Sequence, residues 1–288
     1  MYKQICLITG ATDGVGRAAA SDLAGKGFTV VLAARNAVKA EAVKKEIVAA
    51  TGNADVECMV ADFKSLNEIR QLAEAFKQRY PVLDVLVNNA GITAPSRVLT
   101  EDGYETTYQV NYLSQFLLTH LLLNRLKTSE QGRIINLTSN VYTMGKFDPQ
   151  NLQSENHFST MSAYSASKLL VLLFTIELAK RLQGTRITAN AVHPGIVKTQ
   201  MMLKAQGLFK LISYLALPFA ISPEEGAATP VYLASSWDIK RISGAYFTNC
   251  REKPVKTKFN TEQDRELLWN ISMECLQNGG LITPPTPA

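Results

Sequence analysis

The most distinctive chemical signal in the sequence is a tyrosine followed four residues later by a lysine. Tyr164 and Lys168 belong to the run Tyr-Ser-Ala-Ser-Lys, and on a helix this spacing places both side chains on one face. A free tyrosine has a pKa of about 10, and a nearby ammonium group favours the phenolate and lowers that pKa. Many such pairs decorate helix surfaces, but this one opens an otherwise apolar helical segment. We therefore interpret it as an acid–base site that works near neutral pH.

A serine ends the predicted strand that precedes this helix. Ser139 closes the run Asn-Leu-Thr-Ser. The carboxyl edge of a central strand in an open α/β sheet faces the ligand crevice. A hydroxyl group there is suited to hold a substrate oxygen, although a serine in this position also caps loops and helices.

Three glycines lie in the turn between the first predicted strand and the following helix. Residues 9–16 read Thr-Gly-Ala-Thr-Asp-Gly-Val-Gly, a GxxxGxG spacing. Glycines let the backbone approach a pyrophosphate without Cβ atoms, and the N-terminus of the helix presents free N–H groups to the phosphate. An ordinary tight turn is the alternative, but the place directly after the first strand favours a dinucleotide site.

The end of the second predicted strand distinguishes the two nicotinamide cofactors. An acidic residue there binds the ribose hydroxyls of NAD, but residues 33–36 read Ala-Ala-Arg-Asn. Arg35 can pair with a 2′-phosphate through its planar donors, and a solvated loop arginine is the alternative. The sequence therefore favours NADP(H) over NAD(H).

Short apolar runs alternate with longer helical patterns through the first two thirds of the chain. Runs such as VVLAA and DVLVN are apolar on both faces, which is typical of parallel strands covered by helices on both sides. The pattern predicts an α/β fold, a doubly wound parallel sheet of Rossmann-like type, as a single domain over residues 1–288. The expected strands are 5–9, 28–33, 56–61, 82–87, 133–138, 186–192 and 244–248. The expected helices are 18–26, 37–50, 66–80, 163–182 and 262–276, with another within 101–126 and one that begins at the capping box 222–225.

The composition excludes several classes of protein. A net charge of +5, without long runs of like charge, argues against nucleic-acid binding. Four cysteines without CxxC pairs predict no metal site and a reducing, cytoplasmic location. We find no secretory signal and no run of bilayer length, so no integral membrane segment is expected. His120, His157 and His193 lack partners at triad or metal spacing, and we assign them no catalytic role.

Taken in order along the chain, these residues resemble the short-chain dehydrogenase/reductase superfamily over roughly residues 3–250. The similarity is greatest to its retinol dehydrogenase-like branch, because of the long gap between Ser139 and Tyr164 and the runs at 193–199 and 250–252. Five motifs occur in the order of the family: residues 9–16, Asp62, the run Asn88-Asn89-Ala90-Gly91, Ser139 with Tyr164 and Lys168, and Pro194-Gly195.

The resemblance implies a catalytic set that interconverts a carbonyl and an alcohol. Tyr164 would be the general acid in reduction and the general base in oxidation. Lys168 would lower the pKa of Tyr164 and bind the nicotinamide ribose, and Ser139 would orient the carbonyl. Asn111, in the run Gln-Val-Asn, would hold a water in the proton relay.

The resemblance also implies a cofactor site. Asp62 would contact the adenine amine with Phe63 beside the ring, while Asn89 and Gly91 would line the cofactor path. Asp13 stands where some NADP-preferring relatives carry a basic residue, which leaves Arg35 as the main partner of the 2′-phosphate. The full expected set is Gly10, Thr12, Asp13, Gly14, Val15, Gly16, Arg35, Asn36, Asp62, Phe63, Asn89, Ala90, Gly91, Tyr164, Lys168, Pro194, Gly195, Ile196 and Thr199.

An apolar, methionine-rich stretch follows the Pro-Gly motif and is a predicted substrate lid at about 199–220. It indicates an apolar substrate such as a retinoid, steroid, lipid aldehyde or aromatic ketone, although core packing or peripheral membrane contact would use the same residues. A C-terminal extension follows at about 251–288. The alternatives are a non-catalytic cofactor-binding regulator or scaffold, and an enzyme of this fold with other chemistry. The apolar helices at 116–126 and 169–182 suit either a monomer or a homodimer.

Overall fold

A single mixed sheet forms the centre of the molecule. The structure is a computed structural model that describes residues 3–198 and 217–282. Strands lie in the order β3-β2-β1-β4-β5-β6-β7-β8, and every neighbouring pair is parallel except β7 and β8. The bounds are Ile5–Thr9 (β1), Thr29–Ala34 (β2), Val56–Val60 (β3), Val85–Asn88 (β4), Arg133–Leu137 (β5), Thr188–Val192 (β6), Tyr246–Thr248 (β7) and Arg251–Lys253 (β8).

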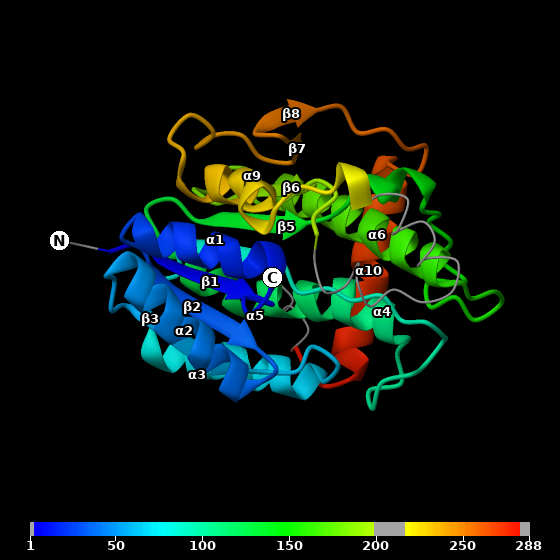
Figure 1. Cartoon of the computed structure of the whole chain (residues 1–288). Helices are drawn as coiled ribbons and strands as arrows, with labels where there is room; N and C mark the ends of the chain where they lie inside the picture. The colour runs from blue at the N-terminus through cyan, green and yellow to red at the C-terminus, as the bar shows by residue number, and fades with distance from the viewer. Residues whose placement is uncertain (1–2, 199–216, 283–288) are drawn as a thin grey trace.

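Helices cover both faces of this sheet, as the sequence predicts for a doubly wound fold (Figure 1). One buried cluster joins the sheet to α1, α2 and α9, and a second joins it to α3, α5, α6 and α10. The bounds are Gly14–Gly25 (α1), Ala37–Thr51 (α2), Leu66–Arg79 (α3), Thr106–Tyr108 (α4), Ser114–Lys127 (α5), Thr160–Arg181 (α6), Pro223–Ser235 (α9) and Glu262–Asn278 (α10).

The edge strand β8 was not predicted from the sequence. Its three residues, Arg-Glu-Lys, are all exposed and lack the apolar alternation by which strands are recognised. The turn before it holds Asn249 and Cys250 at φ of 50° and 56°, which suits a tight hairpin with both central residues at positive φ. Charged side chains at an edge also discourage pairing with another chain.

The helix expected within 101–126 is interrupted. Between α4 and α5 the residues Gln109–Leu113 form a π-helical turn, and the Ser114 N–H donates to the carbonyl of Gln109. Such turns carry one extra residue per turn and are frequent at functional sites. This one contains Asn111.

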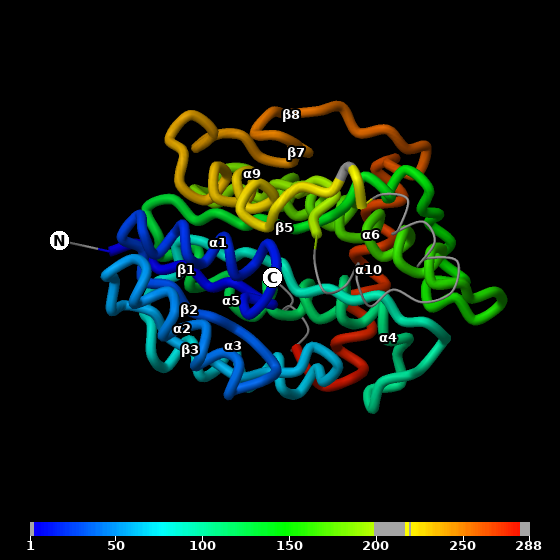
Figure 2. Tube along the Cα trace, viewed as in Figure 1, coloured from blue at the N-terminus to red at the C-terminus, as the bar shows by residue number. Residues whose placement is uncertain are grey.

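The helix α6 is the one helix, among the residues that the structure describes, long and apolar enough to cross a membrane. However, 72% of its most apolar 18-residue stretch is buried inside the fold, as in a core helix. The C-terminal helix α10 packs against α6, and Figure 2 shows its red trace beside the green traces of α5 and α6. The apolar faces of α5 and α6 therefore contribute to the core of a single chain.

Candidate active site

The carboxyl ends of the parallel strands meet at one edge of the sheet, where open α/β sheets bind ligands. The predicted site residues follow these strand ends. Gly10 follows β1, Arg35 follows β2, Asp62 follows β3, Asn89 follows β4, Ser139 follows β5 and Pro194 follows β6.

The structure brings Tyr164, Ser139 and Lys168 together at the end of β5. The α6 helix begins at Thr160, and Tyr164 lies in its second turn with a side-chain hydrogen bond to Ser139. The Lys168 ammonium nitrogen donates to the carbonyl of Leu137 at 2.9 Å and lies 5.7 Å from the centroid of the Tyr164 ring. The lysine is only 4% exposed.

Burial controls the protonation of this group. It raises the pKa of Tyr164 to about 12, against the opposing effect of the hydrogen bond from Ser139. It also lowers the pKa of Lys168 to about 8. The expectation that Lys168 would bring the pKa of Tyr164 below its usual value was therefore wrong for this structure, because desolvation outweighs the hydrogen bond with Ser139, which lowers that pKa. At neutral pH the tyrosine holds its proton, as a general acid must.

Asn111 connects the π turn to the helix that carries the tyrosine and lysine. Its oxygen accepts the N–H of Ile92 at 2.7 Å, and its Nδ2 donates to the Ile92 carbonyl and to Ser167 Oγ, each at 3.0 Å. Ser167 in turn donates to the carbonyl of Tyr164 at 2.7 Å. Both side-chain amide protons of Asn111 are thus used, so a relay water would have to donate a hydrogen bond to an oxygen of Asn111. Ser167 was not predicted as a site residue, although its position between Tyr164 and Lys168 was a signal.

The glycine-rich turn is held against β4 by two polar side chains. Thr9 Oγ1 accepts the N–H groups of Asn89 and Ala90, both at 2.9 Å. The Asn89 Nδ2 donates to the carbonyls of Thr9 at 2.8 Å and Gly10 at 3.1 Å. A Cβ at Gly16 would lie 2.4 Å from that nitrogen, so only glycine fits. Asn89 therefore holds the turn, and its expected place along the cofactor path stays a prediction.

The phosphate end of the site carries exposed charges. Asp13 caps α1 through the Gly14 N–H at 2.8 Å and pairs with Lys39 at 3.2 Å. Arg35 is exposed, while Asn36 caps α2 by accepting the N–H of Lys39 at 2.8 Å. Lys39, which was not predicted as a site residue, brings a second cation to the end where Arg35 is expected to act.

The residues present fit a dinucleotide. The described hydrogen bonds leave the N–H groups of Val15 and Gly16 at the start of α1 free for an anion. Thr12 beside them is partly exposed. At the other end, a Cβ on Gly91 would lie 3.4 Å from Asn111 Oδ1 and 3.5 Å from Lys168 Nζ, so the glycine keeps space open against the candidate catalytic groups.

Two expected adenine contacts differ in their surroundings. Asp62 is partly exposed and accepts the N–H of Lys64 at 2.9 Å. Phe63 is only 6% exposed and belongs to the hydrophobic core, which leaves little of its ring to face a cofactor. Its carbonyl accepts the hydroxyl of Ser114 at 2.7 Å.

The segment after β6 carries the last predicted residues. Pro194 and Gly195 are partly exposed, Gly195 has a φ of 97°, and Ile196 is 39% exposed. Burial lowers the pKa of the preceding His193 to about 4, so that histidine is neutral at physiological pH. Thr199 and most of the expected lid lie outside the described residues.

The sequence model of the family described as short chain dehydrogenase matches residues 4–207. The chain belongs to the short-chain dehydrogenase family. It is 40% identical over 273 residues to retinol dehydrogenase 12 of Mus musculus, covering 95% of this chain and 86% of that protein. It is also 40% identical to retinol dehydrogenase 14 of Mus musculus, covering 94% of this chain and 85% of that protein. The predicted retinol dehydrogenase-like branch is confirmed.

Several solved structures share the fold. A protein from Mycobacterium paratuberculosis superposes with a TM-score of 0.76 at 29% identity, covering 95% of this chain and 93% of that one. A short-chain dehydrogenase from Escherichia coli, complexed with NADPH, gives a TM-score of 0.67 at 27% identity, covering 86% and 96%. As a member of this family, the protein is an oxidoreductase that acts on alcohol and carbonyl groups.

Proposed function

We propose that the protein uses NADP(H) to interconvert a carbonyl and an alcohol on an apolar small molecule. The observation that carries the proposal is the buried group of Tyr164, hydrogen-bonded to Ser139, with Lys168 beside it. A protein that only binds a cofactor has no physical need for these three groups together.

The residues divide the work of the reaction between them. In reduction Tyr164 donates its proton to the carbonyl oxygen, and in oxidation it removes the proton from the alcohol. Ser139 donates a hydrogen bond to the substrate oxygen, and the positive charge of Lys168 stabilises the negative charge that develops on the tyrosine. Lys168 would also hold the nicotinamide ribose. The bound cofactor supplies or accepts the hydride.

The choice of NADP(H) rests on the charges after β2. Arg35 is exposed at the end of that strand, as a partner for a 2′-phosphate must be, and Lys39 lies in the first turn of the next helix. Two of the similar short-chain dehydrogenases, from Escherichia coli and Shigella flexneri, were solved with NADPH and NADP.

The substrate class rests on sequence and on similarity. The most similar relatives named above are retinol dehydrogenases, and residues 199–220 are rich in methionine and other apolar side chains. We propose an aldehyde or ketone with a long apolar body, with retinoids first among the candidates. A cytoplasmic location stays a prediction from the sequence.

The test is a turnover assay with purified protein. NADPH or NADH is mixed with a panel of apolar aldehydes and ketones, including retinal, and the cofactor absorbance is followed. We expect turnover with NADPH that is lost in Tyr164→Phe and retained in Tyr80→Phe, a half-buried tyrosine at the end of α3. Tight NADPH binding without turnover on any carbonyl would instead support the alternative function, a non-catalytic cofactor-binding regulator or scaffold.

A further inference from the structure

The position of Asn111 depends on a helical conformation that needs support. Asn111 lies in the π turn Gln109–Leu113, where one extra residue is inserted into the helix. This geometry is rare, and neighbouring contacts must stabilise it against a regular α-helix. On one side, Asn111 itself bonds to Ile92 and Ser167. On the other side the supporting side chain is Tyr112, which is fully buried.

Tyr112 is hydrogen-bonded to the C-terminal helix. Its hydroxyl lies 2.6 Å from Ser272 Oγ, and Ser272 donates its own proton to the carbonyl of Leu268 at 2.8 Å. A serine hydroxyl has one proton, so Tyr112 must be the donor in their shared bond. Burial raises the pKa of Tyr112, which keeps that donor proton in place across the physiological range.

Two further contacts of α10 lie on either side of the π turn. Cys275 is hydrogen-bonded to Tyr104, which precedes the turn, and the ring of Trp269 lies 5.0 Å from that of Phe116, which follows it. The order of contacts along α10 is the reverse of the order along residues 104–116. The helix α10 therefore runs antiparallel to this segment and contacts it before, within and after the π turn.

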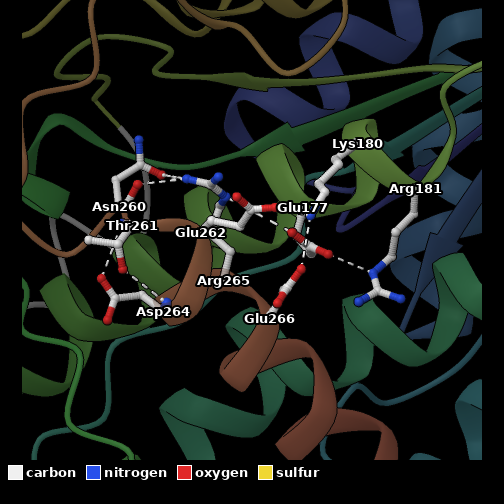
Figure 3. Close-up of polar contacts among 9 residues, drawn as sticks. All are labelled: Glu177, Lys180, Arg181, Asn260, Thr261, Glu262, Asp264, Arg265 and Glu266. Carbon is white, nitrogen blue, oxygen red and sulfur yellow. Dashed lines mark hydrogen bonds and ion pairs between the residues drawn. The ribbon is translucent and has the colours of Figure 1, made fainter.

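The same helix is also fixed to α6, which carries the candidate proton donor. Lys180 pairs with Glu262 and Glu266, and Glu177 accepts from Arg181 at 2.7 Å with Arg265 at 4.0 Å (Figure 3). The exposed pairs of Lys180 contribute little stability, whereas the Glu177 carboxylate is 1% exposed and lies between α6 and α10. The Arg181 guanidinium also lies 4.4 Å above the ring of Trp269.

We propose that Ser272 is a positioning residue for the reaction, and that α10 sets the geometry of the π turn and thereby of Asn111. The proposal rests on the proposed function, because Asn111 contributes only if the site moves a proton. Losing the bond to Ser272 leaves the Tyr112 hydroxyl buried without an acceptor and frees the π turn to shift toward an α-helical register. Displacements of about 1 Å at a reacting group reduce turnover strongly.

The test compares Ser272→Ala, Tyr112→Phe and the double variant with the full-length wild type. We expect the turnover number for carbonyl reduction to fall roughly tenfold in each single variant, with the KM for NADPH changed less than about twofold. The double variant should be no worse than either single one, because both remove the same bond. The matched control is Ser235→Ala, which removes a hydroxyl that donates to the helical carbonyl of Val231 at 2.8 Å, away from the site.

Hydrogen exchange supplies a readout that does not need turnover. We expect faster exchange of the amides in 106–114 in Ser272→Ala and Tyr112→Phe, and unchanged exchange there in Ser235→Ala. Unchanged turnover in folded Ser272→Ala, or additive losses in the double variant, would overturn the proposal. Wild-type protein that reduces no carbonyl would defeat the proposed function instead. In that case, unchanged hydrogen exchange in both variants would also overturn the claim that α10 stabilises the π turn. Faster exchange would support that claim, although the reaction itself would be disproved.

Discussion

The two ends of the candidate site differ in their contact with water. At the phosphate end, Arg35 is exposed, and the ion pair between Asp13 and Lys39 joins side chains that are 46% and 50% exposed. At the proton-transfer end, Lys168 is 4% exposed, and burial shifts the pKa of both Lys168 and Tyr164. Charges in water act weakly and are screened by salt, whereas buried charges act through desolvation and fixed hydrogen bonds. We therefore expect the open end to tune affinity and the closed end to set the rate.

The largest expected effect comes from removing the buried charge. In Lys168→Met we expect the turnover number to fall by about 100-fold or more, because the ammonium group stabilises the charge that develops on Tyr164. The measurement is steady-state reduction of the best carbonyl substrate. Lys77→Met, a partly buried lysine on α3 that pairs with Glu74, is the control and should keep wild-type turnover. Equal losses in both variants would contradict the special role of the closed end.

The same substitution should stabilise the fold. The pKa of Lys168 falls from 10.5 to about 8 on folding, so at neutral pH the native state carries a buried ammonium group that resists burial. This shift corresponds to a cost of about 3 kcal/mol at pH 7, and the loss of the bond to Leu137 in the variant offsets part of the gain from removing it. We expect Lys168→Met to raise the free energy of unfolding by about 1–2 kcal/mol at pH 7, measured by urea denaturation. A lower free energy of unfolding would show that the bond to Leu137 outweighs desolvation.

The second-largest expected effect comes from a substitution at the open, phosphate-binding end of the site. In Arg35→Glu we expect the KM for NADPH to rise roughly 30- to 100-fold while that for NADH changes little, because the carboxylate repels a 2′-phosphate. The turnover number at saturating cofactor should stay within about threefold of wild type. Arg70→Glu, an exposed arginine on α3, is the control. A loss of turnover at saturation without a change in KM would reverse the division between the two ends.

The pH dependence of reduction gives an intermediate effect. As the pH rises through about 8, Lys168 loses its proton in the folded enzyme while Tyr164, with a pKa of about 12, keeps its own. The charge that supports proton donation is then lost, so the turnover number should fall above about pH 8. The measurement is a profile from pH 6 to 10 at constant ionic strength. A fall centred near pH 10 would show that bound ligands restore the ordinary protonation of the lysine.

The features of the fold and site that the sequence predicts depend on local patterns along the chain. The parallel strands are buried on both faces, so their apolar runs were recognisable, and the Tyr164–Lys168 spacing on one helix marked the site directly. Strand ends of a parallel sheet share an edge, so the sequence alone places Ser139 and the glycine-rich turn at the same edge. These features depend on local periodicity and on topology, which a single sequence contains.

The missed features depend on contacts between distant segments. The bonds of Thr9 to Asn89, of Asn111 to Ser167 and of Tyr112 to Ser272 join residues far apart in the chain. The π turn differs from an α-helix by one residue, which hydrophobic periodicity cannot resolve. The pKa direction of Tyr164 was mispredicted because the sequence shows its charged neighbour but not how deeply both groups are buried.

The smallest expected effect concerns the carboxylate beside the phosphate site. Asp13 lies in the glycine-rich turn and holds Lys39 at 3.2 Å. In Asp13→Asn the cap on Gly14 can persist through the amide oxygen, while a negative charge is removed and Lys39 is released toward the cofactor. We expect the KM for NADPH to fall about two- to fivefold at low salt.

This gain should disappear as salt is added, because both partners are about half exposed and their charges are screened within a Debye length of about 10 Å at 0.1 M. The measurement is the NADPH KM of wild type and Asp13→Asn at 0.05 and 0.5 M NaCl. The turnover loss in Lys168→Met should be the same at both salt concentrations, because that charge is shielded from ions by burial. If the lower NADPH KM of Asp13→Asn did not depend on salt, the carboxylate would act through the shape of the turn. The contrast between an open electrostatic end and a closed catalytic end would then not hold for Asp13.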